Sequence, residues 1–151
     1  MPPFILPLAD IASTLETVGG KGMSLSILAR AGLPVPGGFH VTTDAYRRFI
    51  ADNELQAPIL ETVKKADASQ YASLETAAHH IRMLFDTAPV PAEISSAISA
   101  ACSNLGDTPV AVRSSATAED LPDASFAGLQ NTYLNIRGEK AILEAVKWCW
   151  A

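Results

Sequence analysis

The chain has 151 residues, of which 48% are hydrophobic and 18% charged, and its mean hydropathy is +0.18. This composition can bury a core and excludes a disordered chain, and the length fits one domain or a piece of a larger protein. The formal net charge of -5 argues against a broad nucleic-acid-binding surface. We therefore expect any anionic ligand to be held by a few placed cations.

Nothing in the sequence indicates export or insertion into a membrane. The first ten residues contain prolines and an aspartate, and they lack the basic flank and long apolar run of a signal peptide. The apolar runs are too short to span a bilayer. Cys102 and Cys149 have no metal-ligand spacing, and we expect a cytoplasmic protein without a membrane partner.

The N-terminal part combines short strands with one helix. Residues 4–8 form an apolar run typical of a strand, and residues 39–41 are expected to form a second strand. Between them, the glycines of residues 19–22 interrupt the pattern. The apolar spacing from Met23 onward predicts a helix of about three turns that ends at Gly32.

Helices dominate the middle of the chain. Thr42 or Thr43 is expected to cap one helix, and residues 54–105 have helical patterns throughout. Breaks are expected at residues 67–69 and 89–91, where the second proline suits the first position of a helix. Neither break has the composition of a domain linker.

Strands return in the last part of the chain. Residues 110–112 and 131–136 predict two strands, followed by a final helix over residues 141–150. The sum is an α+β fold with strands at both ends. The final helix has no stop signal and carries Trp148 and Trp150, so we expect a chain cut from a longer protein and two rings that pack on a downstream segment.

Residues Gly19-Gly20-Lys21-Gly22 have the chemistry of an anion site. Gly20 and Gly22 let backbone N–H groups approach a phosphate, Lys21 adds a mobile cation, and the following helix adds positive potential. The run is not a P-loop, because Leu15 and Gly22 stand where that motif needs glycine and serine or threonine. The alternative is a flexible start of a helix without a ligand.

Arg113 ends the apolar strand of residues 110–112 and presents a planar fork of donors suited to a phosphate or a carboxylate. Ser114, Ser115 and Thr117 follow, and their hydroxyls either bind phosphate or cap a turn. The alternative for Arg113 is an ion pair with an acid of the next segment. Those acids are Glu119, Asp120 and Asp123.

A loop of small residues follows at residues 125–128. Gly128 permits close approach of the backbone and Thr132 offers a hydroxyl, so the loop either lies over a triphosphate or forms an ordinary hairpin. Two separate phosphate-binding elements in one chain indicate a nucleotide. His79 and His80 are assigned to a solvated helix face, and we expect no metal site in this sequence.

Three motifs together resemble a known family. Residues 19–22, 32–39 and 112–128 stand in the order and spacing of the N-terminal nucleotide-binding region of the phosphoenolpyruvate synthase and pyruvate phosphate dikinase family, which the rifampin phosphotransferases share. The match runs from about residue 18 to the end. The third motif is long enough that chance is a poor explanation, although Leu129 replaces a glutamine that members often carry.

The resemblance implies an ATP-grasp fold, in which ATP lies between two subdomains and residues 1–151 form the first as a partial, C-terminally truncated domain. It implies that Lys21 and Arg113 contact ATP phosphates, Arg113 being the catalytic candidate, and that Gly128 and Thr132 belong to the loop over the nucleotide. The remaining members of the expected ATP-binding set are Gly20, Gly22, Ser114 and Thr117. In such proteins the Mg2+ ligands belong to the second subdomain.

The resemblance also implies a reaction. In this family ATP is cleaved to AMP and phosphate, and the β-phosphoryl group passes to a histidine on a mobile domain and then to pyruvate or to a rifamycin hydroxyl. We expect the ATP-binding portion of a phosphoenolpyruvate synthase-like phosphotransferase, with a rifampin phosphotransferase as the alternative. Its partners would be the downstream subdomain and the phosphohistidine domain, so the isolated chain should be inactive and bind ATP weakly. A stand-alone nucleotide-sensing or interaction module is the alternative of another class.

Overall fold

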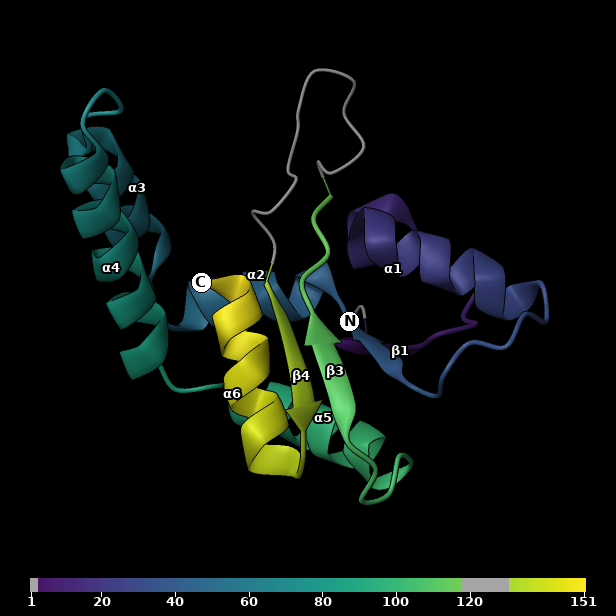
Figure 1. Cartoon of the computed structure of the whole chain (residues 1–151). Helices are drawn as coiled ribbons and strands as arrows, with labels where there is room; N and C mark the ends of the chain where they lie inside the picture. Colours follow the sequence, from purple (N-terminus) through teal and green to yellow (C-terminus); the bar gives the residue numbers. More distant parts are fainter. Residues whose placement is uncertain (1–2, 118–130) are drawn as a thin grey trace.

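A computed structural model describes residues 3–117 and 131–151 (Figure 1). Its helices and short antiparallel strands confirm the α+β fold, with strands near both ends of the chain. Strand β1 (Ile5–Pro7) pairs with β2 (Phe39–Val41), so that Leu6 lies opposite His40. Strand β3 (Val110–Arg113) pairs with β4 (Thr132–Ile136) in a second antiparallel sheet. The four strands lie close to the expected positions.

Helix α1 (Leu15–Arg30) connects β1 to β2 and begins earlier than the sequence predicts. A capping box starts it, because the hydroxyls of Thr14 and Thr17 each accept a hydrogen bond from the other's backbone N–H. Only Gly19 leaves the helical conformation, with φ 71° and ψ 177°. The expected start at Met23 was wrong, since one glycine provides the whole break and the residues after it are helical.

Four helices follow β2: α2 (Thr43–Asp52), α3 (Gln56–Lys65), α4 (Tyr71–Thr87) and α5 (Ala92–Ser103). Figure 1 shows α3 and α4 as a hairpin that projects from the rest. Thr42 occupies the N-cap of α2, but its hydroxyl donates to the Pro3 carbonyl instead of capping the helix. Pro91 is the N-cap of α5 and not its first helical residue, because its ψ of 140° is extended.

Helix α6 (Glu139–Trp150) packs along the β3–β4 hairpin and closes the core (Figure 1). Phe49 and Phe85 are buried there, with ring centroids 5.6 Å apart, and Trp150 lies 5.2 Å from Phe49. Trp150 therefore packs on this domain's own core, and the expectation that it packs on a downstream segment was wrong. Trp148 is 40% exposed, and its ring lies 5.3 Å from that of Tyr133.

A buried cation attaches α6 to the end of α4. Lys147 is 7% exposed, and its Nζ donates to the Asp86 carbonyl at 2.9 Å. Carbonyls in the last turn of a helix lack intrahelical partners, so the ammonium satisfies one of them. Within the described parts of the chain, no helix is long and apolar enough to cross a membrane.

Candidate functional site at the junction of α1 and β3

Residues 19–22 of α1, here called the glycine turn, are hydrogen-bonded to residues 114–116, which follow β3. The Gly20 N–H donates to the Ala116 carbonyl at 3.1 Å, and the Gly22 N–H donates to Ser115 Oγ at 3.0 Å. These contacts join two elements that the sequence places 93 residues apart. The two motifs that sequence analysis treated as separate phosphate-binding elements are therefore one structural unit.

Gly19 allows this close approach. A Cβ on Gly19 would lie 2.7 Å from the backbone carbon and oxygen of Ser115 and would also overlap its hydroxyl. The φ of +71° is in the left-handed region, which residues other than glycine rarely adopt. Position 19 therefore requires glycine for two independent reasons, its own backbone conformation and the backbone packed against it.

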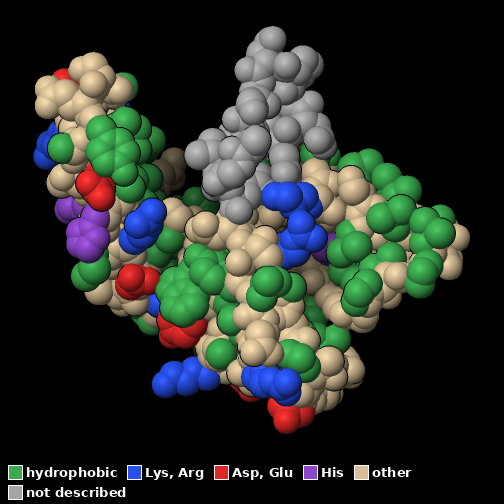
Figure 2. Space-filling view, in the orientation of Figure 1, with side chains coloured by type: hydrophobic (Ala, Val, Ile, Leu, Met, Phe, Trp, Pro, Cys, Tyr) green, Lys and Arg blue, Asp and Glu red, His purple; other side chains and the backbone are tan. Residues whose placement is uncertain are grey.

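Two cations lie at this junction. Lys21 Nζ donates to the Ser114 carbonyl at 3.4 Å, and Arg113 is the residue directly before Ser114. Arg113 is exposed, and within residues 3–117 and 131–151 no carboxylate lies within 4 Å of it. Figure 2 shows Lys and Arg side chains over the region where α1 approaches β3. Positive charge is therefore concentrated where the glycine turn meets the sheet.

The hairpin register places a predicted partner beside Arg113. Thr132 is the residue opposite Arg113, and the preceding pair along β3 is Val112 opposite Tyr133. Residues directly opposite in an antiparallel pair share a face of the sheet. Tyr133 contacts Trp148 of α6, so Arg113 and Thr132 belong to the face turned away from that helix, and both are exposed.

Comparison with known proteins identifies the family. Residues 15–151 match the family model described as pyruvate phosphate dikinase, AMP/ATP-binding domain. The chain belongs to this family. The resemblance inferred from the three motifs is thereby confirmed.

Curated relatives carry two different names. The chain is 44% identical over 151 residues to a rifampicin phosphotransferase of Streptomyces sviceus, covering 98% of the chain and 17% of the relative. It is 43% identical over 153 residues to a phosphoenolpyruvate synthase of Deinococcus radiodurans, covering 97% and 20%. It is 44% identical over 158 residues to a phosphoenolpyruvate synthase of Aeropyrum pernix, covering 97% and 19%. The chain thus spans about a fifth or less of the length of these relatives.

Ser114 and Thr117 are further members of the expected ATP-binding set in this AMP/ATP-binding domain. The backbone N–H and the hydroxyl of Ser114 both donate to the Asn131 carbonyl, at 3.2 and 3.3 Å, so Ser114 ties β3 to the start of β4. Thr117 is exposed just after the junction. Gly128 lies outside the described residues, as do the acids that were the alternative partners of Arg113.

Sequence reasoning named Ser115 as a hydroxyl but missed its role in the AMP/ATP-binding domain. Its Oγ accepts from Gly22, while the Gly20 amide is bonded to Ala116. The signal in the sequence was the glycine run itself, because a missing Cβ indicates that another part of the chain approaches closely. That signal does not say which part approaches.

Metal-ligating groups are not gathered in the described part of the AMP/ATP-binding domain. Among residues 3–117 and 131–151, no group of three or more His, Cys, Asp or Glu side chains is placed to hold a metal ion. Mg2+ prefers several oxygen ligands with near-octahedral geometry. We therefore assign no Mg2+ ligand among these residues.

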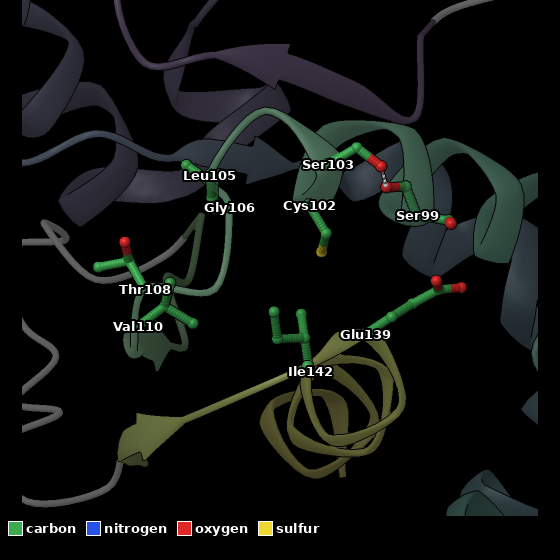
Figure 3. A pocket seen from close by; sticks show the side chains of 10 residues that line it. Ser99, Cys102, Ser103, Leu105, Gly106, Thr108, Val110, Glu139 and Ile142 are labelled. Carbon is green, nitrogen blue, oxygen red and sulfur yellow. Dashed lines mark hydrogen bonds between the residues drawn. The ribbon is translucent and has the colours of Figure 1, made fainter.

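A small pocket lies at the opposite end of β3 from Arg113. It has a volume of about 190 Å³ and is bounded by the C-terminal end of α5, Val110 of β3 and the start of α6. Figure 3 shows the Cys102 thiol and Ile142 pointing into it. Burial and the nearby Glu139 raise the pKa of Cys102, so the thiol stays protonated and is a poor nucleophile. Because it lies at the other end of β3, the pocket is separate from the cationic junction, the region of Lys21, Arg113 and residues 114–116.

Proposed function

We propose that the chain is the ATP-binding part of a phosphotransferase of the phosphoenolpyruvate synthase type. In this proposal ATP, pyruvate and water are converted to AMP, phosphate and phosphoenolpyruvate, through a phosphohistidine on another domain. The observation that carries the proposal is the junction of the glycine turn with residues 114–116. It brings Lys21 Nζ to 3.4 Å from the carbonyl of the residue that follows Arg113.

The junction suits the chemistry of phosphoryl transfer. That reaction needs neutralisation and alignment of phosphate oxygens more than covalent help from the protein. Lys21 supplies a compact ammonium, and Arg113 supplies a planar fork of donors. Thr132 adds a hydroxyl on the same face of the hairpin as Arg113. Bound Mg2+ would neutralise further phosphate charge, and its ligands are proposed to lie outside the described residues.

The remaining site residues have supporting roles in the proposal. Gly20 and Gly22 permit the packing of α1 against Ser115 and Ala116, and Ser114 holds β3 to β4. Gly128 is proposed, from the resemblance alone, to belong to a loop that covers the nucleotide. Thr117 follows the junction and is proposed to bind phosphate through its hydroxyl.

A rifampicin phosphotransferase is the second candidate. The chain is as similar to the Streptomyces sviceus protein of that name as to the two phosphoenolpyruvate synthases, at 43–44% identity. The described site contains groups suited to phosphate and none that recognises an acceptor. The choice between pyruvate and a rifamycin therefore depends on residues outside the cationic junction.

The test is an acceptor assay on the full-length gene product. With ATP, water and pyruvate we expect AMP, phosphate and phosphoenolpyruvate in equal amounts. Label placed in the β-phosphate of ATP should appear in phosphoenolpyruvate, and label in the γ-phosphate should appear as inorganic phosphate. Phosphorylated rifampicin in place of phosphoenolpyruvate would establish the second candidate. ATP binding without AMP formation for either acceptor would contradict both and support a nucleotide-sensing module.

A further inference from the structure

A buried polar pair joins α1 to β2. Ser26 on α1 is 0% exposed and His40 on β2 is 8% exposed, and Ser26 Oγ lies 2.9 Å from His40 Nε2. Burial lowers the pKa of His40, and a backbone interaction with Leu8 opposes this effect. A buried polar group that loses its partner is costly, so the hydroxyl and the imidazole hold the helix and the strand in one arrangement.

The same imidazole lies against the glycine turn. A Cβ on Gly22 would lie 3.4 Å from His40 Nδ1, which places the ring directly beside the backbone at that position. Ser26 lies four residues after Gly22, the spacing that α-helical backbone hydrogen bonds connect. His40 therefore contacts α1 at two successive turns, through Gly22 and through the Ser26 hydroxyl.

Gly22 is itself part of the cationic junction. Its N–H is bonded to Ser115 Oγ, and the adjacent Lys21 reaches the Ser114 carbonyl. The turn begins immediately after Gly19, whose backbone leaves the helical conformation. Two side chains pack on Gly22, that of Val18 from the first turn of α1 and that of His40 from β2, and His40 is the one that links the turn to another element.

We propose that His40 and Ser26 are positioning residues for nucleotide binding, which hold the glycine turn so that Lys21 stays beside Arg113. The inference rests on the proposed function and adds to it two residues that no phosphate contact would reveal. Both side chains are buried, so they act through Gly22 and Lys21 and do not touch the nucleotide.

The test compares variants of the full-length gene product. Ser26→Ala and His40→Leu remove the pair, and His40→Gln keeps a side chain able to bond to the Ser26 hydroxyl. Thr42→Val is the matched control, because Thr42 is 2% exposed and its hydroxyl donates to the Pro3 carbonyl at 2.9 Å, away from the glycine turn. The measured quantities are KM for ATP, KM for the acceptor, kcat and the melting temperature.

Loss of the pair should raise KM for ATP about tenfold in Ser26→Ala and His40→Leu, with kcat and acceptor KM within about twofold of the unaltered protein. In His40→Gln, KM for ATP should lie close to the value of the unaltered protein. Thr42→Val should lower the melting temperature comparably and leave KM for ATP within about twofold, because a general loss of stability does not move the turn.

The rate of hydrogen exchange at the Gly22 amide measures how firmly the glycine turn is held, and the measurement does not require catalysis. Exchange should be faster in Ser26→Ala than in Thr42→Val, since only the former loosens the bond to Ser115. If the unaltered protein binds no ATP, the proposed function fails and this inference fails with it. If it binds ATP and Ser26→Ala matches Thr42→Val in both ATP KM and Gly22 exchange, the positioning role alone is overturned.

Discussion

The Gly22 N–H donates a 3.0 Å hydrogen bond to Ser115 Oγ across 93 residues of sequence. The Gly20 N–H is likewise bonded, to the Ala116 carbonyl. Both amides are satisfied by the protein itself, so we infer that the cations Lys21 and Arg113 provide the attraction for phosphate. The glycines contribute by letting two distant segments pack together.

Ser115→Ala should destabilise the domain by about 1–2 kcal/mol, because it leaves the Gly22 N–H without its acceptor. Urea denaturation measures the change. Ser103→Ala is the control, since the exposed Ser103 hydroxyl donates only to the Ser99 carbonyl within α5, and it should stay within about 0.5 kcal/mol of the unaltered protein. Equal effects for the two variants would show that the Ser115 bond adds no stability.

Gly19→Ala should lower the free energy of unfolding by about 3 kcal/mol or more, since a methyl group meets the Ser115 backbone at 2.7 Å. Gly32→Ala separates the two causes of strain. Gly32 has a similar φ of +75°, but a Cβ there has no heavy atom within 4 Å, so only the conformational cost of about 1 kcal/mol applies. Thermal melts that shift equally for both variants would contradict the close approach.

Arg113→Ala in the full-length gene product should reduce phosphoryl transfer from ATP at least about tenfold, because the guanidinium that we propose to bind phosphate is lost. Its melting temperature should change little, since Arg113 is exposed. Arg137→Ala is the control at the other end of the same hairpin, where Nη1 donates to the Asp107 carbonyl. A steady-state assay that finds both variants equally active would remove Arg113 from the proposed site.

Trp150→Ala should cost about 3 kcal/mol of stability, because its ring packs on Tyr46 and Phe49 in the core. Trp148→Ala should cost about 1 kcal/mol, since that ring is 40% exposed and pairs with Tyr133. Urea denaturation monitored by circular dichroism gives both values without depending on tryptophan fluorescence. The reverse order would contradict the placement of the two rings.

Stability should fall as the pH is lowered below about 6.5, because burial holds the pKa of His40 under this ordinary value in the folded protein. The unfolded chain then binds a proton that the folded protein does not. The contribution of neutral His40 to the free energy of unfolding is complete above about pH 6.5 and is lost as the pH falls towards the folded-state pKa of this residue. Urea denaturation at about pH 7.5 and about pH 5.5 measures it.

His40→Gln should weaken this pH dependence. His79→Gln is the matched control, because His79 is exposed on α4 and its removal should leave the pH dependence in place. A pH dependence that is the same in the unaltered protein and in His40→Gln would assign the effect to other groups.

Local patterns predicted most of the elements. Alternating and apolar runs located β2 and β4, and prolines marked the break between α4 and α5. The start of α1 was misplaced, because a capping box of two threonines lies outside the usual pattern with glutamate or glutamine and the glycine run concealed it. Trp150 was misassigned because its partners, Tyr46 and Phe49, lie about a hundred residues upstream.

The sequence by itself determined the α+β class, the glycine turn and the two cations, since each depends on residue type and short-range spacing. Only the tertiary structure decided that the Gly22 amide is bonded to Ser115, that Arg113 faces away from α6 with Thr132, and that the His40 ring lies beside Gly22. The physical reason is that hydrogen-bond partners far apart in sequence are selected by how helices and strands pack. Local conformational preference carries no information about that choice.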